Sequence, residues 1–184
     1  MSELQVNHVM IPLAEYATVS EDATLFQAVQ ALSKSQEHFD QNKDRHRAIL
    51  VLDEKSHVVG KLSQWDVIKG LEPNYEKIGD FRGTTHTGIT SDFFRSMMKD
   101  YGLWNRPLRD LCRKASQIRV KDIMYTPTEG EYVKEEESLD QAIHQLIVGH
   151  HQSLLVVRGE KIVGILRLSD VFREVCMMIL ACEV

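Results

Sequence analysis

Two short stretches of the chain contain the residues best suited to hold a small ligand. In the first, Ser63 stands three residues before Asp66. A hydroxyl at the start of a helix, with backbone N–H groups beside it, favours a phosphate, and an aspartate in the first turn can accept both hydrogen bonds of a ribose diol. The second stretch has Asp170 at the matching place but Arg167 where the hydroxyl would stand. An arginine there can pair with a phosphate or fill the pocket.

The first of these stretches also permits a purely structural interpretation. A serine followed three residues later by an acid is an ordinary helix cap, which stabilises a helix by about 1 kcal/mol. From Ser63 and Asp66 alone, ligand binding and helix capping both remain open.

The two stretches belong to an internal repeat. Val6–Met10 aligns with Val120–Met124 at an offset of 114, whereas Asp66 aligns with Asp170 at an offset of 104 (170 − 66). The first copy therefore contains ten extra residues (114 − 104), nine of them before its central strand and one in the turn that follows. A repeat that persists through two insertions is a specific signal of duplicated structure.

Each copy predicts the element order strand, helix, strand, strand, helix. Capping boxes at Thr24–Gln27 and Ser138–Gln141 open the first helix of each copy. The apolar runs Ala48–Leu52 and Ser153–Val157 are typical of buried strands. One such unit is too small to bury much core alone, so we expect the two copies to pack their sheets together about a pseudo-two-fold axis.

The sequence thus predicts an α/β (α+β) fold with a first repeat at 4–72, a helical insert at 73–117, and a second repeat with a C-terminal helix at 118–184. The insert is too long for a plain linker. It contains an apolar stripe at helical spacing, which we expect to pack on the repeats. The stripe consists of Phe93, Phe94, Met97, Met98 and Tyr101.

Composition and motif content exclude several classes of function. The net charge of −5 does not favour a nucleic-acid partner, and no apolar run reaches the roughly 18 residues of a membrane span. The three cysteines form neither an even disulfide set nor a CxxC pair, which favours a reduced, cytoplasmic setting. No catalytic triad, phosphate loop or metal-ligand spacing is visible, so we expect neither an enzyme nor a metal site.

The repeated unit resembles the CBS domain, and the tandem pair resembles a Bateman module. The resemblance rests on the Val-x-x-x-Met opening of each copy, on Pro12 and Pro127 just after those openings, and on the two corners. In this family the corner has a glycine, two apolar residues, a hydroxyl residue, two variable residues and an aspartate. The first copy matches it from Gly60 to Asp66, except that Lys61 takes an apolar position.

The resemblance implies a regulatory module that binds an adenosine-containing ligand in the clefts between the two repeats. The ligand would be AMP, ADP, ATP or S-adenosylmethionine, with no covalent cofactor. The module would pass its occupancy to a regulated protein. The final helix, Val171–Leu180, offers more apolar surface than one small sheet needs, so we expect at least a homodimer. The expected ligand-binding residues lie on both copies: Ser63, Asp66, His46, Arg47 and Val19 on the first, and Arg167, Asp170 and Val133 on the second.

Two alternatives follow from the second corner. If Arg167 turns inward, it should pair with an acid and occupy its cleft, which would leave one strong site organised by Ser63 and Asp66. If both pockets are degenerate, the chain would instead serve as a structural dimerisation module.

Overall fold

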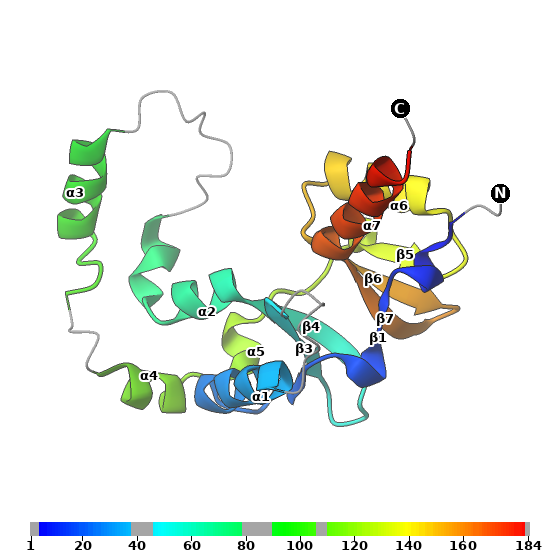
Figure 1. Ribbon diagram of the computed structural model, residues 1–184. Coiled ribbons are helices and arrows are strands. Elements are labelled where there is room, and N and C mark those ends of the chain that lie inside the picture. Colours follow the sequence, from blue (N-terminus) through cyan, green and yellow to red (C-terminus); the bar gives the residue numbers. More distant parts are fainter. Residues whose placement is uncertain (1–3, 38–45, 79–89, 106–109, 183–184) are drawn as a thin grey trace.

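A computed structural model describes residues 4–37, 46–78, 90–105 and 110–182. Within these ranges the strands form a three-stranded sheet of order β2-β3-β4 and a four-stranded sheet of order β1-β7-β6-β5. The two sheets belong to two lobes that adjoin at the centre of the molecule (Figure 1). The predicted mixed fold of two repeats is confirmed.

The first repeat builds the three-stranded sheet and the helices that cover it. Strand β2 is parallel to β3, and β3 is antiparallel to β4. Alternation along β3 sends Ile49 and Val51 into the core under the helices, whereas Leu50 faces the other repeat. The elements are η1 (Val6–His8), β1 (Ile11–Pro12), η2 (Leu13–Glu15), β2 (Thr18–Ser20), α1 (Leu25–Glu37), β3 (Ala48–Leu52), β4 (Val58–Ser63) and α2 (Gln64–Gly70).

The second repeat follows the same order of elements. Strand β5 is parallel to β6, and β6 is antiparallel to β7, so its pairing duplicates that of the first repeat. The elements are α5 (Val120–Ile123), η5 (Glu129–Glu131), β5 (Tyr132–Lys134), α6 (Leu139–Val148), β6 (Ser153–Arg158), β7 (Lys161–Arg167) and α7 (Leu168–Leu180).

The opening segment of each repeat pairs with the last strand of the other. Ile11 in β1 is the antiparallel partner of Ile165 in β7, and Tyr125 forms the corresponding bridge to Lys61 in β4. Tyr125 and Ile11 differ by the repeat offset of 114 (125 − 11), and Ile165 and Lys61 by 104 (165 − 61). This reciprocal exchange is what a pseudo-two-fold axis between the repeats requires.

Each repeat has its own core, and a third cluster joins them. This shared cluster is apolar apart from one tyrosine hydroxyl, and both sheets contribute to it. Its buried members are Ile11, Tyr16, Leu50, Leu155 and Ile165. Burying these side chains between the sheets helps to hold the repeats together, as does the packing of each opening segment into the core of the other repeat.

The insert consists of η3 (Pro73–Ile78), α3 (Ser91–Asp100) and α4 (Leu111–Gln117). Helix α4 contacts α1 and extends the core of the first repeat. Helix α3 buries none of its residues and stands apart from both lobes (Figure 1). The prediction that its apolar stripe packs on the repeats is wrong, because Phe93 and Phe94 remain 40% and 58% exposed.

The longest helices of the described ranges, α1 and α7, have 13 residues each. Among the helices that the structure describes, none has the length and apolar character needed to cross a bilayer.

Candidate functional site

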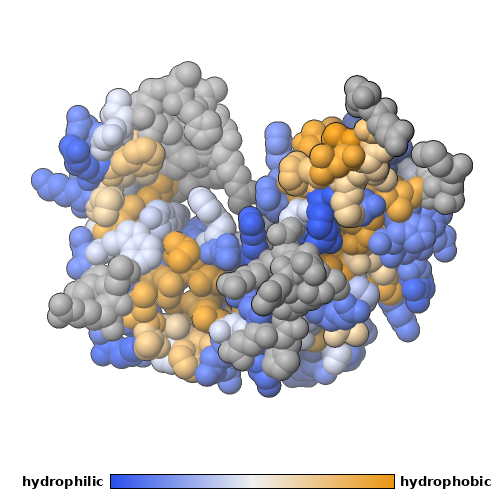
Figure 2. All heavy atoms as spheres, viewed as in Figure 1, coloured by the Kyte–Doolittle hydropathy of each residue, from blue (hydrophilic) through white to orange (hydrophobic). Residues whose placement is uncertain are grey.

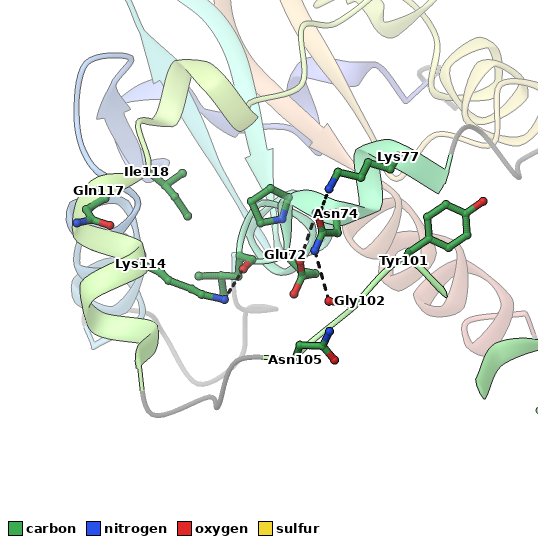
Figure 3. A pocket seen from close by; sticks show the side chains of 11 residues that line it. Glu72, Asn74, Lys77, Tyr101, Gly102, Asn105, Lys114, Gln117 and Ile118 are labelled. Atoms are coloured by element: carbon green, nitrogen blue, oxygen red, sulfur yellow. Dashed lines mark hydrogen bonds between the residues drawn. The ribbon is translucent and has the colours of Figure 1, made fainter. Parts of the chain in front are cut away.

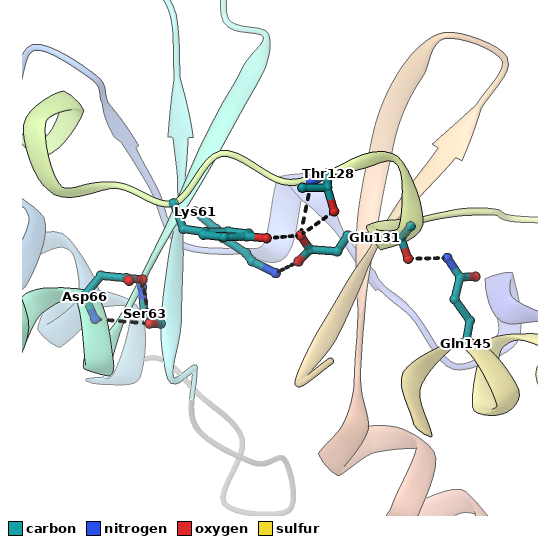
Figure 4. Close-up of polar contacts among 8 residues, drawn as sticks. Lys61, Ser63, Asp66, Thr128, Glu131 and Gln145 are labelled. Atoms are coloured by element: carbon teal, nitrogen blue, oxygen red, sulfur yellow. Dashed lines mark hydrogen bonds and ion pairs between the residues drawn. The ribbon is translucent and has the colours of Figure 1, made fainter. Parts of the chain in front are cut away.

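The first strand-to-helix corner joins β4 to α2 and is closed by a capping box. The Ser63 backbone N–H donates to Asp66 Oδ2 at 2.8 Å, and the Ser63 hydroxyl donates to the same oxygen at 2.6 Å. In return, the Asp66 N–H donates to Ser63 Oγ at 3.3 Å. Figure 4 shows the two side chains facing one another at the start of the helix. The capping role of these residues is therefore present in the structure.

The capping box leaves part of the Asp66 carboxylate available. Both Ser63 and Asp66 are only partly buried. Among the described residues, the hydrogen bonds that Asp66 accepts both end on Oδ2, which leaves Oδ1 without a donor. A carboxylate that caps its helix with one oxygen and keeps the other accessible can accept a further hydrogen bond from a ligand hydroxyl.

The second corner joins β7 to α7 and is filled by an ion pair. Arg167 donates through Nε to Asp170 Oδ2 at 2.5 Å and through Nη2 to Asp170 Oδ1 at 2.7 Å. Arg173 adds a contact of 3.3 Å to Oδ1. Arg167 and Asp170 are 6% and 1% exposed, respectively. Both oxygens of Asp170 are thus engaged by guanidinium groups, and the side chain of Arg167 lies inside the fold.

A polar bridge between the repeats lies beside the first corner. Lys61 stands two residues before Ser63 on β4, hence on the same face of the sheet. Its Nζ lies 2.5 Å from Glu131 Oε1, and the Tyr125 hydroxyl donates to Glu131 Oε2 at 2.6 Å (Figure 4). The Thr128 N–H donates to the same Oε2 at 3.1 Å.

This bridge fixes the charge of Glu131. Burial by itself would raise the pKa of Glu131, but the hydrogen bonds from Lys61 and Tyr125 outweigh it and hold that pKa below its usual range. The sequence interpretation treated Lys61 only as a departure from an apolar position and missed Glu131. The repeat alignment contained a signal for this pair. Glu131 stands where the first copy has Ala17 (131 − 114), and Lys61 stands where the second copy has Ile165, so an acid and a base each replace an apolar residue of the other copy.

The two corner glycines allow the repeats to approach each other. A Cβ on Gly60 would lie 2.7 Å from Met124 Sδ, and a Cβ on Gly164 would lie 2.5 Å from the Ile11 carbonyl oxygen. The methionine of each opening segment therefore sits over the corner glycine of the other repeat. This packing alone accounts for both glycines.

Three of the remaining predicted site residues, His46, Val19 and Val133, are buried or pack into the cores. His46 is 1% exposed, with its ring edge-on to Tyr16 at a centroid distance of 4.2 Å. Burial raises the pKa of Tyr16 to about 12, with Arg167 opposing the rise. The side chain of Val133 is buried in the core of its repeat, and that of Val19 is partly buried against the core of the first repeat.

Arg47 differs from the other predicted residues in being exposed. Its carbonyl oxygen accepts the Gln64 N–H at 3.1 Å, which places Arg47 directly beside the first corner. Within the part of the chain that the structure describes, no group of three or more His, Cys, Asp or Glu side chains is arranged to hold a metal ion.

Comparison with known proteins agrees with this architecture. The family model of the CBS domain matches residues 6–73 and 120–176. A search of curated proteins finds no significant match.

Solved structures similar to this chain are CBS-pair structures. The CBS domain of a CBS domain containing membrane protein from Sphaerobacter thermophilus is 18% identical, with a TM-score of 0.60 over 93% of this chain and 87% of that chain. CBSX2 in complex with AMP is 18% identical, with a TM-score of 0.57 over 95% and 98%. The CBS domain of a bacterial CNNM/CorC family Mg²⁺ transporter in complex with ATP is 16% identical, with a TM-score of 0.58 over 94% and 87%. At these identities the likeness establishes the fold.

Proposed function

The chain belongs to the CBS domain family, and from this premise we propose that it is a regulatory module that binds an adenosine-containing ligand at the Ser63–Asp66 corner. The ligand is AMP, ADP, ATP or S-adenosylmethionine, held in the cleft between the repeats. The AMP complex of CBSX2 and the ATP complex of the Mg²⁺ transporter domain support an adenine nucleotide. The module acts without catalysis, in the cytoplasm, and passes its occupancy to a regulated protein.

The observation that supports this proposal most is the difference between the two corners. Asp66 is partly exposed and caps its helix through Oδ2. Asp170 is buried, and both its oxygens are taken by Arg167. A ribose diol needs a carboxylate with accessible acceptor oxygen, which only the first corner offers. We therefore assign one ligand to each chain, at the first corner.

The charge beside the first corner suits the phosphate of such a ligand. Arg47 is exposed and adjoins Gln64, the first residue of α2, through its backbone. A guanidinium in this place can pair with phosphate oxygens in two parallel hydrogen bonds. Arg47 therefore has the phosphate-binding role, and Asp66 the ribose-binding role.

Calorimetric titration with AMP, ATP and S-adenosylmethionine tests the site. Asp66→Ala should weaken binding roughly ten- to hundredfold, because a hydrogen bond to a charged group contributes about 1.5–3 kcal/mol. The matched control is Asp140→Ala, which removes an exposed acid from the first turn of α6. Asp140→Ala should bind as the wild type does. Unchanged affinity in Asp66→Ala would remove Asp66 from the site.

The same titration measures the inequality of the two corners. The wild type should bind one ligand per chain, and Arg167→Thr should gain a second site because the substitution opens the corner and supplies the hydroxyl. Arg173 still contacts Asp170 in this variant and limits the cost of leaving that carboxylate buried. Two equal, independent sites in the wild type would refute the asymmetry.

One observation favours a second function, that of a structural dimerisation module. Helix α7 exposes an apolar surface, whose most exposed members are Phe172, Ile179 and Leu180. Figure 2 shows apolar atoms gathered over this helix. Exposed surfaces of this kind mark interfaces, so we include a homodimer in the proposal. A chain that dimerises but binds none of the three ligands would be a scaffold alone.

A further inference from the structure

A hollow of about 550 Å³ lies in the insert, outside the cleft between the repeats. Its volume falls within the range of small-molecule sites, which is about 300–1,000 Å³. Figure 3 shows it between η3, the turn that follows α3, and α4. Its lining combines apolar surface with two lysines and three side-chain amides: Lys77, Lys114, Asn74, Asn105 and Gln117.

One wall of this insert pocket is fixed by a buried carboxylate. Glu72 is 5% exposed, and its Oε2 accepts the Trp104 N–H at 2.8 Å while its Oε1 accepts the Asn74 N–H at 3.3 Å. Trp104 has a φ of 56°, a left-handed conformation that a bulky residue adopts only when its surroundings impose it. The Asn74 side chain also donates to the Gly102 carbonyl at 3.4 Å. The turn is therefore held in shape before any ligand arrives.

The lysines give the insert pocket an excess of positive charge. Lys77 Nζ donates to Asn74 Oδ1 at 2.7 Å, and Lys114 Nζ donates to the Leu71 carbonyl at 3.3 Å (Figure 3). Among the described residues, neither ammonium group forms an ion pair with a carboxylate. The one acid of the lining, Glu72, directs its oxygens to backbone N–H groups. Two cations whose hydrogen bonds go to neutral acceptors give this pocket a charge that favours an anion.

We propose that the insert pocket binds a small molecule that bears a phosphate or carboxylate group, with Lys77 and Lys114 contacting the anion. The position of the pocket connects it to both repeats. Leu71 caps α2 at the end of the first repeat, and Ile118 precedes α5 of the second. The Ile118 carbonyl accepts the Leu25 N–H at 2.9 Å, at the start of α1. A ligand in the insert pocket therefore touches the segments through which the chain leaves one repeat and enters the other.

The test uses inorganic pyrophosphate and citrate as probes, titrated by calorimetry at constant ionic strength. Neither probe contains ribose, and Arg47→Gln removes the proposed phosphate contact of the adenosine site. Probe binding at the insert pocket should therefore be unchanged in both Asp66→Ala and Arg47→Gln. Lys77→Gln and Lys114→Gln should each weaken binding about tenfold, since each removes one charge-assisted hydrogen bond. The glutamine amide at 114 retains a donor for the Leu71 carbonyl, which guards against loss of the fold.

The matched control is Lys99→Gln, which removes an exposed lysine of α3 that does not line the insert pocket. This control should bind the probes as the wild type does. Saturable binding of pyrophosphate alone assigns a phosphate ligand, and binding of citrate alone assigns a carboxylate ligand. The proposal is overturned if neither probe binds saturably, or if Lys99→Gln weakens binding as much as the two pocket variants do.

Discussion

One added methyl group at Gly164 should destabilise the protein more than one at Gly60, although the two glycines occupy equivalent places. At Gly164 the new Cβ would lie 2.5 Å from the Ile11 carbonyl oxygen, which is backbone held in the β1–β7 pairing. At Gly60 the shortest approach, 2.7 Å, is to the sulfur of Met124. A methionine side chain can change rotamer, whereas a paired strand cannot move without losing its register.

The expected magnitudes follow from the cost of overpacking a core, about 1–3 kcal/mol. Gly164→Ala should lie near the upper end, at about 3 kcal/mol. Gly60→Ala should cost about 1 kcal/mol, because the Tyr125 carbonyl also stands at 3.1 Å. For a chain of this length about 1 kcal/mol corresponds to roughly 2–4 °C in Tm, so the two variants should differ by about 4–8 °C.

Urea unfolding of single and double variants identifies the atom responsible. Met124→Val removes the sulfur and should restore part of the stability lost in Gly60→Ala. Met10→Val should give no such rescue of Gly164→Ala, because the contact with the Ile11 carbonyl persists. A double-mutant cycle measures this difference directly. Equal losses at both glycines, or equal rescue by both methionine variants, would refute the argument.

Two further predictions concern the polar bridge and α7. The pKa of Glu131 is lowered in the folded protein, so its contribution to stability is present above the unfolded pKa and is lost as pH falls through the folded value. Urea unfolding from neutral pH into the acid range should show this loss of stability. Lys61→Met, which removes the cation that lowers the pKa, should show a smaller loss. Ile179→Glu should shift the light-scattering mass from two chains to one, because it places a charge on the exposed apolar surface of α7. Arg95→Glu on exposed α3 is the control and should leave the mass unchanged. An unchanged mass in Ile179→Glu would exclude α7 from the interface.

Duplication made the architecture predictable from the sequence. The alignment of Asp66 with Asp170 gave two equal sets of elements, and the hydrophobic runs indicated which strands are buried. The exchange of opening segments could not be predicted, because the apolar pattern of Ile11 specifies burial but not which strand it pairs with. The repeat symmetry would have constrained that exchange only after one of the two pairings was known.

The wrong prediction that α3 packs on the repeats has a physical reason. An amphipathic stripe such as that containing Phe93 and Phe94 predicts that one face is covered, but it does not say by what. Helix α4, by contrast, contacts α1, and its Leu111 and Ala115 pack against the core of the first repeat. The apolar face of α3 remains exposed in a single chain.

Under the proposed function, one structural requirement leaves room for ligand binding in only one of the two corners. Both α2 and α7 need an acid in the first turn to complement their exposed N–H groups. In the first copy a serine shares that task, so Asp66 engages through one oxygen and stays partly exposed. In the second copy Arg167 replaces the hydroxyl and forms a bidentate pair with Asp170 that is buried, so removing either partner would leave an uncompensated buried charge. The aspartate that we propose binds ligand in one repeat is engaged by Arg167 in the other, so the residue type at positions 63 and 167 is the difference on which the proposed asymmetry rests.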